Sequence, residues 1–536
     1  MVAELDSAPM RKTSGGMRIE TRPLHIEEWL DKLPYIDFQK TGTILHEAIQ
    51  ATNKESIKPA TRLELVELYN RPYQYYLDSQ IKTGAQHTLQ SISSMQAQLA
   101  ILKKISVNLG LSCKLAVDEL LKKKTLWGQS KPPLPAMLMS LNYLSHAMIF
   151  SFLEYAPIPK NVWQEVHNIF TFAQDIGQEN NTLVLPGKDA KTEATSIAHA
   201  YKRIVLAALA DPHHLPFGAI WEIFEQLQDW AEFAHIRKFE KPSGESGFFV
   251  VNLNKDTPPL PYSKFNTKLV TEQHRLIDTT ALGKVIQQHL AALNNGQKLD
   301  SNVRISPYFA KSIMTHMSKA WGLPPKRHFS RESREGSMKV SCGLNATYYY
   351  LNGQMDFIAP EDENANDEYL VDPMEETIQR VYTTEEWSLV DQGPGGFAVI
   401  KNDKPRETVR VGDLVGVVAS PPGELEKWEI GVIRWLMIRQ NKIYKIGIQM
   451  IGKHAYPISL RAGSGSQLEM QHRRAILLDD PADKSKRSII CSKGLFQEQR
   501  EIEIQYKAQK QVLFTEQLIE STVSFEHFSV GKSPAA

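Results

Sequence analysis

The sequence is poor in cysteine, which argues against a disulfide-stabilised fold. Its three cysteines, Cys113, Cys342 and Cys491, lie far apart in a chain of 536 residues and form no CxxC pair. An odd number of separated cysteines is untypical of secreted disulfide frameworks. A chain of this length also buries apolar cores without disulfides or metal ions.

An excess of one charge and a secretory signal are absent as well. The chain has 62 Lys and Arg against 61 Asp and Glu, so no overall field attracts nucleic acid or membranes, and anion binding must be local. The first 16 residues contain no apolar signal segment. Residues 134–153 are uncharged and long enough to span a bilayer, but their Pro, Ser, Asn and His residues would lack partners in lipid. We predict a buried helix there, and a cytoplasmic protein that neither spans a membrane nor binds nucleic acid.

Motifs of catalysis and metal binding are missing too. The sequence has no GxSxG, P-loop, HExxH or paired-cysteine motif. Its adjacent histidines, His213 and His214, would point apart, which does not favour a metal site. We expect no enzyme, no metal and no cofactor. The alternative left open is an enzyme whose site lies among the helices of residues 60–240.

The first half of the chain has the apolar periodicity of helices. In residues 219–236, apolar side chains recur at helical spacing between acidic and amide residues, and breaks rich in Pro and Gly separate such stretches. This pattern predicts a partly irregular N-terminal segment at 1–59 and an all-α bundle or stack of helical hairpins at 60–240. A linker and mixed α/β region is expected at 241–321.

In the second half the apolar period falls to two, as in strands. Residues 340–351 and 444–451 alternate in this way, and 408–419 and 428–436 are predicted as further strands. Short antiparallel strands joined by turns favour a closed barrel, which leaves no exposed sheet edge. The predicted fold class is multidomain α plus β, with a small barrel at 322–465. A β-rich extension at 466–536 would cover this barrel or form a small sheet of its own.

An acidic segment interrupts the predicted barrel. Residues 356–376 contain nine acidic residues and no basic one, which is the composition of a mobile loop. We predict an insert at 356–380 between two strands. The alternative is that these carboxylates compete with an anionic ligand for nearby arginines.

Basic side chains are concentrated just before the predicted barrel. The stretch PKRHFSRESREG, residues 325–336, carries Arg327 and Arg331 as R-x-x-x-R, with Arg334 three residues further on. A guanidinium is planar, always charged, and donates two parallel hydrogen bonds to a phosphate or to the O6 and N7 atoms of guanine. The pattern alone fits a solvated linker equally well.

A glycine-rich stretch lies after the acidic segment. DQGPGG, residues 391–396, separates two strand-like stretches, and its glycines permit close approach of a ligand to the backbone. The carboxylate of Asp391 could accept the N1 and N2 protons of guanine. The alternative is a turn in which the aspartate caps its own backbone.

Taken together, these features resemble the PilZ family of bacterial cyclic di-GMP receptors. In that family R-x-x-x-R precedes the first strand of a six-stranded antiparallel barrel, and a [DN]-x-S-x-x-G motif lies on the following strands. The resemblance covers about residues 322–465. It implies that Arg327 and Arg331 bind phosphates and guanine edges, and that Asp391, Gly393 and Gly396 hold the other guanine face. Arg334, which lies outside the family motif, is a further candidate for ligand binding.

Two features depart from the family pattern. Gly393 replaces the usual serine, so one hydroxyl hydrogen bond worth about 1 kcal/mol is missing, and the acidic insert lengthens the interval between the motifs. The arginines and the aspartate are present.

We therefore predict a cyclic di-GMP effector that binds one or two ligand molecules. Binding would order the basic linker and change how the barrel is arranged relative to a helical domain, which would regulate motility, adhesion or biofilm output through an unknown protein partner. The alternative is a non-binding, PilZ-like adaptor that acts through protein contacts alone.

Overall fold

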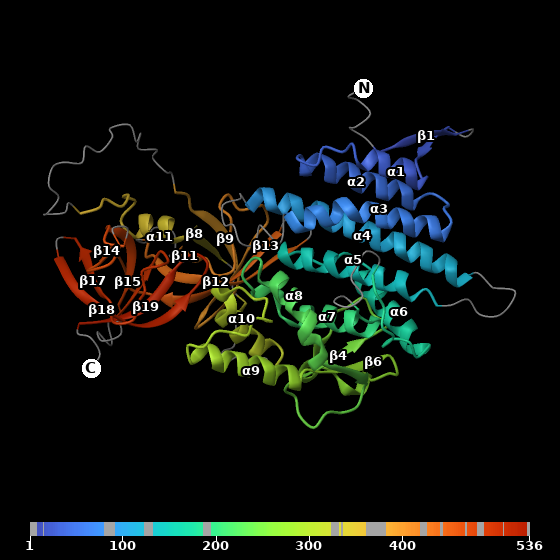
Figure 1. The fold of residues 1–536 in the computed structure, drawn as a ribbon. Helices are drawn as coiled ribbons and strands as arrows, with labels where there is room; N and C mark the ends of the chain where they lie inside the picture. Colours follow the sequence, from blue (N-terminus) through green and yellow to red (C-terminus); the bar gives the residue numbers. More distant parts are fainter. Residues whose placement is uncertain are drawn as a thin grey trace. The chain divides into compact units, whose positions relative to one another are not determined.

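The computed structural model describes residues 8–13, 16–79, 92–122, 132–185, 194–322, 332–333, 336–360, 382–418, 426–439, 443–466, 469–479, 487–507 and 509–532. The chain divides into two compact units, Met1–Lys326 and Arg327–Ala536. The first unit is mainly helical and the second is mainly β-structure (Figure 1). The predicted fold class, α plus β with a helical N-terminal half, is confirmed.

Helices make up most of the described part of the first unit. They are α1 (Pro23–Leu30), α2 (Phe38–Asn53), α3 (Pro59–Leu77), α4 (Ile92–Lys122), α5 (Leu134–Leu153), α6 (Val162–Asp175), α7 (Ile197–Leu209), α8 (Ala219–Trp230), α9 (Thr280–Asn294) and α10 (Pro307–Ala320). A hairpin joins β1 (Met10–Thr13) to β2 (Gly16–Ile19), and a four-stranded sheet has the order β3-β6-β4-β5. Its strands are β3 (His235–Lys238), β4 (Phe248–Asn252), β5 (Leu260–Pro261) and β6 (His274–Asp278).

One apolar core joins these elements, from Ile26 in α1 to Trp321 after α10. The indole N–H of Trp321 donates to the carbonyl of Leu206 in α7 at 3.1 Å, and the Thr279 hydroxyl donates to the carbonyl of Trp321 at 2.6 Å. The mixed α/β region predicted at 241–321 therefore shares its core with the helices. The predicted helix of residues 219–236 stops earlier, because residues 235–238 pair with β6 as strand β3.

The uncharged helix α5 is buried, as its sequence predicts. It is the one helix of the described residues that is long and apolar enough to cross a membrane, and 94% of its apolar window lies inside the protein. It packs along α4 (Figure 1). The Ser140 hydroxyl donates to the carbonyl of Gly110 in α4 at 3.1 Å, and His146 Nδ1 lies 2.8 Å from the Tyr73 hydroxyl. Its polar side chains thus find partners within the helical core.

The second unit begins with a closed antiparallel ring of six strands, as predicted. Its order is β10-β13-β12-β11-β8-β9, closed by pairing of β9 with β10, and β7 extends the sheet beyond β9. The strands are β7 (Glu332–Ser333), β8 (Ser337–Cys342), β9 (Glu385–Gly393), β10 (Gly396–Lys401), β11 (Leu414–Val418), β12 (Glu429–Arg439) and β13 (Ile443–Gly452).

The strand predicted over residues 340–351 is only partly correct. Strand β8 ends at Cys342, Gly343 adopts φ +88°, and residues Leu344–Leu351 form helix α11. Leu344, Tyr348 and Leu351 contact one apolar cluster at helical spacing, so burial of this face stabilises the helix over the alternating pattern. The strand predicted at 408–419 is likewise shorter, because the backbone turns at Gly412, with φ +90°, before β11 starts.

The β-rich tail forms a second closed barrel. Its order is β14-β15-β16-β19-β18-β17. The strands are β14 (Ala455–Ala462), β15 (Arg473–Leu478), β16 (Arg487–Cys491), β17 (Glu501–Tyr506), β18 (Gln509–Ser521) and β19 (Glu526–Gly531). Strand β14, which lies within the stretch 322–465, is therefore paired with strands of the tail.

An apolar cluster joins the two barrels. Leu414 and Val432 of the first barrel share this cluster with Ile476, Ile490 and Phe525 of the second. The alternate residues of β15 and β16, such as Ala475 and Ile489, fill the interior of the second barrel instead. Because both faces of these strands are buried, their sequences are apolar runs without alternation.

Candidate functional site

The DQGPGG stretch forms the hairpin between β9 and β10. Gly393 pairs with Gly396 across the turn, and Asp391 pairs with Ala398. The backbone N–H of Met450 in β13 donates to the carbonyl of Gly395 at 3.0 Å, which fixes the turn against the neighbouring strand. The sequence correctly predicts this hairpin and the two strands beside it.

Gly396 is required by packing of the backbone. A Cβ atom at this position would lie 2.0 Å from the carbonyl oxygen of Ile448 in β13. Around Gly395, by contrast, a Cβ atom would meet nothing within 4 Å. Of these two glycines, only Gly395 leaves space for a ligand to approach closely.

A β-bulge determines the direction of Asp391. The pairing shifts by one residue between Ala398 and Val399, so that Val390 is the extra residue in β9. Directly paired residues of antiparallel strands lie on the same face. Ala398 pairs with Gly447, on the face of β13 that carries the exposed Gln449, whereas Phe397 and Ile448 are buried on the opposite face. Asp391 and Ala398 therefore belong to the outer face of the barrel. Bulges often re-aim a side chain beside a functional site.

The arginine motif is joined to β7, which lies beside Asp391. Arg327, Arg331 and Arg334 lie outside the described residues, but Arg331 and Arg334 are the chain neighbours of β7 on its two sides. Strand β7 pairs with β9, with Glu332 opposite Gln392 and Ser333 opposite Asp391.

A tryptophan, Trp435, lies on the same outer face. The indole of Trp435 in β12 covers Gly447, where a Cβ atom would lie 1.9 Å from Trp435 Nε1. Gly447 pairs with Ala398, which in turn pairs with Asp391. Trp435 is half-buried, so part of its ring faces solvent on the same face as the aspartate, with β13 and β10 between the two residues. The sequence gives little indication of this position, because the place of the Trp435 ring depends on Gly447 of another strand.

Arg434 occupies a second bulge, next to Trp435. The pairing of β12 with β13 shifts between Ile433 and Trp435, which makes Arg434 the extra residue. Its Nε donates to Gln449 Oε1 at 2.6 Å and its Nη2 donates to Glu520 Oε2 at 2.9 Å, while Nη1 contacts the other carboxylate oxygen. Glu520 belongs to β18 of the second barrel. Arg434 therefore joins the first barrel to the second.

A buried carboxyl group lies at the same junction of the barrels. The Ser524 hydroxyl, between β18 and β19, donates to Asp413 Oδ1 at 3.0 Å. Burial raises the pKa of Asp413 to about 6, although Arg410 and the Ser524 hydrogen bond act to lower it. Polar contacts as well as apolar ones thus fix the second barrel against the first.

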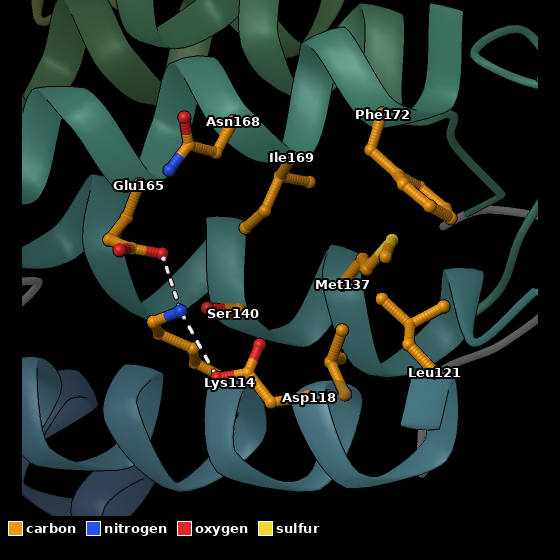
Figure 2. Close-up of a pocket in the computed structure, with 10 residues that line it drawn as sticks. Lys114, Asp118, Leu121, Met137, Ser140, Glu165, Asn168, Ile169 and Phe172 are labelled. Atoms are coloured by element: carbon orange, nitrogen blue, oxygen red, sulfur yellow. Dashed lines mark hydrogen bonds and ion pairs between the residues drawn. The ribbon is translucent and has the colours of Figure 1, made fainter. Parts of the chain in front are cut away.

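A separate cavity of about 220 Å³ lies in the helical unit, among α4, α5 and α6. One end is apolar, and at the other end Lys114 Nζ lies 3.2 Å from Asp118 Oδ2 and 3.4 Å from Glu165 Oε2 (Figure 2). Burial opposes the charge of Lys114, but the two carboxylates outweigh it and raise its pKa. These three side chains carry one excess negative charge. The apolar lining consists of Val117, Leu121, Met137, Ile169 and Phe172.

The described residues contain no group of three His, Cys, Asp or Glu side chains that could hold a metal ion. The second unit instead combines a six-stranded antiparallel barrel, a D-x-G-x-x-G hairpin and an arginine pair that precedes the first strands. This combination defines the class of PilZ-domain proteins.

Three family models match consecutive parts of the chain. They describe the N-terminal domain of the cyclic-di-GMP receptor FimW at residues 24–242, its middle PilZ domain at 248–376 and 358–457, and its C-terminal β-barrel domain at 458–532. The chain therefore belongs to this family of PilZ-containing receptors. It is 22% identical over 562 aligned positions to the cyclic-di-GMP receptor FimW of Pseudomonas aeruginosa PAO1, an alignment that covers 95% of this chain and 90% of that protein.

Proposed function

We propose that this chain binds cyclic di-GMP at the outer face of β9, β10 and β13 and transmits the signal to a protein partner of the helical unit. The observation that carries this proposal is the pairing of β7 with β9. Consecutive Cα atoms are about 3.8 Å apart, so Arg331 and Arg334 are attached directly to residues that pair beside Asp391. Both motifs can then reach one ligand.

Each group supplies a different part of the recognition. Arg327, Arg331 and Arg334 would donate paired hydrogen bonds to phosphates or to the O6 and N7 edge of guanine. The Asp391 carboxylate, which has about four lone-pair positions, would accept from guanine N1 and N2. Gly393 and Gly396, which pair across the turn, would form the backbone next to the ligand, and Gly395 leaves space for its approach.

Binding would also act on the boundary between the two units. That boundary falls between Lys326 and Arg327, at the start of the arginine motif. A ligand that neutralises and orders this segment would shift the equilibrium between arrangements of the two units. The free energy of that shift is limited by the difference between the ligand's affinities for the ordered and for the free segment. Small-angle scattering with and without saturating ligand tests this coupling, and an unchanged profile would contradict it.

We further propose cytoplasmic function, which the free thiols of Cys113, Cys342 and Cys491 support.

Trp435 provides the direct test of ligand binding. We expect cyclic di-GMP to change the tryptophan fluorescence of the protein, because the half-buried indole covers Gly447 on the same face of the barrel as Asp391, and bases stack on aromatic rings. Trp435→Phe should remove this change. The matched control is Trp428→Phe in the same barrel, whose ring is buried and stacks on Tyr350 with centroids 4.8 Å apart, and this variant should retain the response. A protein that binds no cyclic di-GMP in calorimetry would favour the adaptor alternative.

The cavity among α4, α5 and α6 is the proposed contact for the protein partner. Its apolar lining and its excess negative charge suit an apolar side chain of the partner with a basic residue beside it. Such a side chain would bury the exposed part of Leu121 and Phe172. The motility, adhesion or biofilm output of the pathway would depend on this partner.

We expect Leu121→Glu to abolish partner capture from lysate while leaving the affinity for cyclic di-GMP unchanged. The added carboxylate would place a charge in the apolar lining of the cavity, and burying an unpaired charge against the partner's apolar side chain is costly. Leu111→Glu is the matched control, because Leu111 lies on the same helix, is 40% exposed against 44% for Leu121, and does not line the cavity. Equal loss of capture in both variants, or in neither, would contradict this role for the cavity.

A further inference from the structure

Three side chains form a polar connection from the second barrel to the candidate ligand site. Glu520 of β18 accepts a hydrogen bond from each of the two terminal nitrogens of Arg434, and the third nitrogen, Nε, donates to Gln449 Oε1 at 2.6 Å. The guanidinium thus uses all three of its nitrogens within this connection. None of these three residues belongs to the R-x-x-x-R motif or to the D-x-G-x-x-G motif.

Gln449 lies between the inter-barrel core and the D-x-G-x-x-G hairpin. On β13 it pairs with Val432 on one side and with Gly396 on the other. Val432 belongs to the apolar cluster between the barrels, and Gly396 closes the hairpin that carries Asp391. Gln449 is exposed, so its side chain can meet a ligand on this face.

Arg434 determines which end of the Gln449 amide faces the ligand. A guanidinium has only donors, so the amide oxygen must point to Arg434 and the amino group must point away. A flipped amide would place N–H groups against the Arg434 Nε–H. Glu520 prevents Arg434 from turning aside, because two parallel hydrogen bonds fix the guanidinium plane.

An amide amino group held in this way distinguishes between purines. Guanine presents two acceptors, N7 and O6, at the edge where adenine presents the N7 acceptor and an N6 amino donor. A fixed donor therefore matches guanine and opposes adenine. An amide free to flip could adapt to either base.

We propose that Gln449 donates to the O6 and N7 edge of a guanine of the bound dinucleotide, and that Arg434 and Glu520 are positioning residues that make this contact selective. The second barrel thereby completes the ligand site of the first. This inference rests on the proposed function of the chain as a cyclic di-GMP receptor.

Calorimetry of the full chain with cyclic di-GMP and with cyclic di-AMP tests the inference. We expect Gln449→Glu, which replaces the donor with an acceptor, to lower the affinity for cyclic di-GMP by about tenfold or more. Glu520→Gln should lower the preference for cyclic di-GMP over cyclic di-AMP several-fold. The matched control is Glu503→Gln, which disrupts the ion pair of Glu503 with Arg461 within the second barrel, 3.0 Å long, and should leave the preference unchanged.

The ratio of the affinities for cyclic di-GMP and cyclic di-AMP distinguishes a positioning role from a structural one. A loss of protein stability would weaken the binding of both ligands equally and leave the ratio unchanged. Unchanged affinity in Gln449→Glu, or an unchanged ratio in Glu520→Gln, overturns the inference while the wild type still binds cyclic di-GMP. If the wild type binds neither dinucleotide, the proposed function fails, and this inference fails with it.

Discussion

Replacing Arg331 with alanine should weaken cyclic di-GMP binding by about a hundredfold or more. The substitution removes two charge-assisted hydrogen bonds, each worth about 1.5–3 kcal/mol, and every 1.4 kcal/mol is a factor of ten in affinity. We expect a similar loss for Arg327→Ala and about tenfold or more for Asp391→Asn, which places an amide donor against the guanine N1 proton. Calorimetry with each purified variant measures these losses.

Conservative variants separate geometry from charge. Arg331→Lys keeps the positive charge but loses the planar pair of donors, so most of the loss should remain. Asp403→Asn is the control for the aspartate, because Asp403 follows the same hairpin and its side chain is 75% exposed in contact with Lys401. Binding by Arg331→Ala at the wild-type affinity would contradict the proposed site. Equal loss with Asp403→Asn would point to a general charge effect instead.

The parts of the fold that the sequence predicts are those with one clear apolar period. The sequence of strand β13 alternates between apolar residues, such as Ile446 and Ile448, and Lys445, Gly447 and Gln449, because one face of the strand is inside the barrel and the other is outside. The uncharged helix α5 is buried as its composition indicates. The hairpin of residues 391–396 follows from its glycines, because turn residues act locally.

The remaining features depend on contacts that local sequence does not encode. Residues 344–351 fit both a strand and a helix, and only the apolar cluster between the barrels selects the helix. The bulges at Val390 and Arg434 depend on the register of neighbouring strands. The apolar runs of β15 and β16 suggest strands, but not that a second closed barrel buries both of their faces.

The candidate site is divided in the same way. The motif residues are visible in the sequence because their spacing is short. Trp435 and Gln449 are not, because each acquires its place only through pairing with another strand. Sequence reasoning therefore finds the groups that carry charge and misses the surface against which a base would lie.

Phe525→Ala should destabilise both barrels of the second unit together. Phe525 has no exposed surface and lies in the turn between β18 and β19, within the apolar cluster shared with Leu414 and Val432 of the first barrel. Truncating a buried phenylalanine costs about 3–5 kcal/mol, because it removes apolar contacts and leaves a cavity. Amide hydrogen exchange of the full chain should show faster exchange in β11 and β12 as well as in β18 and β19.

This result follows from where the apolar surface lies. If the second barrel separated from the first, Leu414, Ile430 and Val432 would be exposed to water. This exposure costs about 25 cal/mol of free energy per Å² of apolar area. The two barrels should therefore open as one cooperative unit. Val512→Ala is the matched control, because Val512 lies on β18 but is 49% exposed, and it should leave exchange in the first barrel unchanged. If exchange in Phe525→Ala became faster in the second barrel only, the two barrels would open independently. Glu520 of the second barrel could then not determine the position of Gln449 in the first.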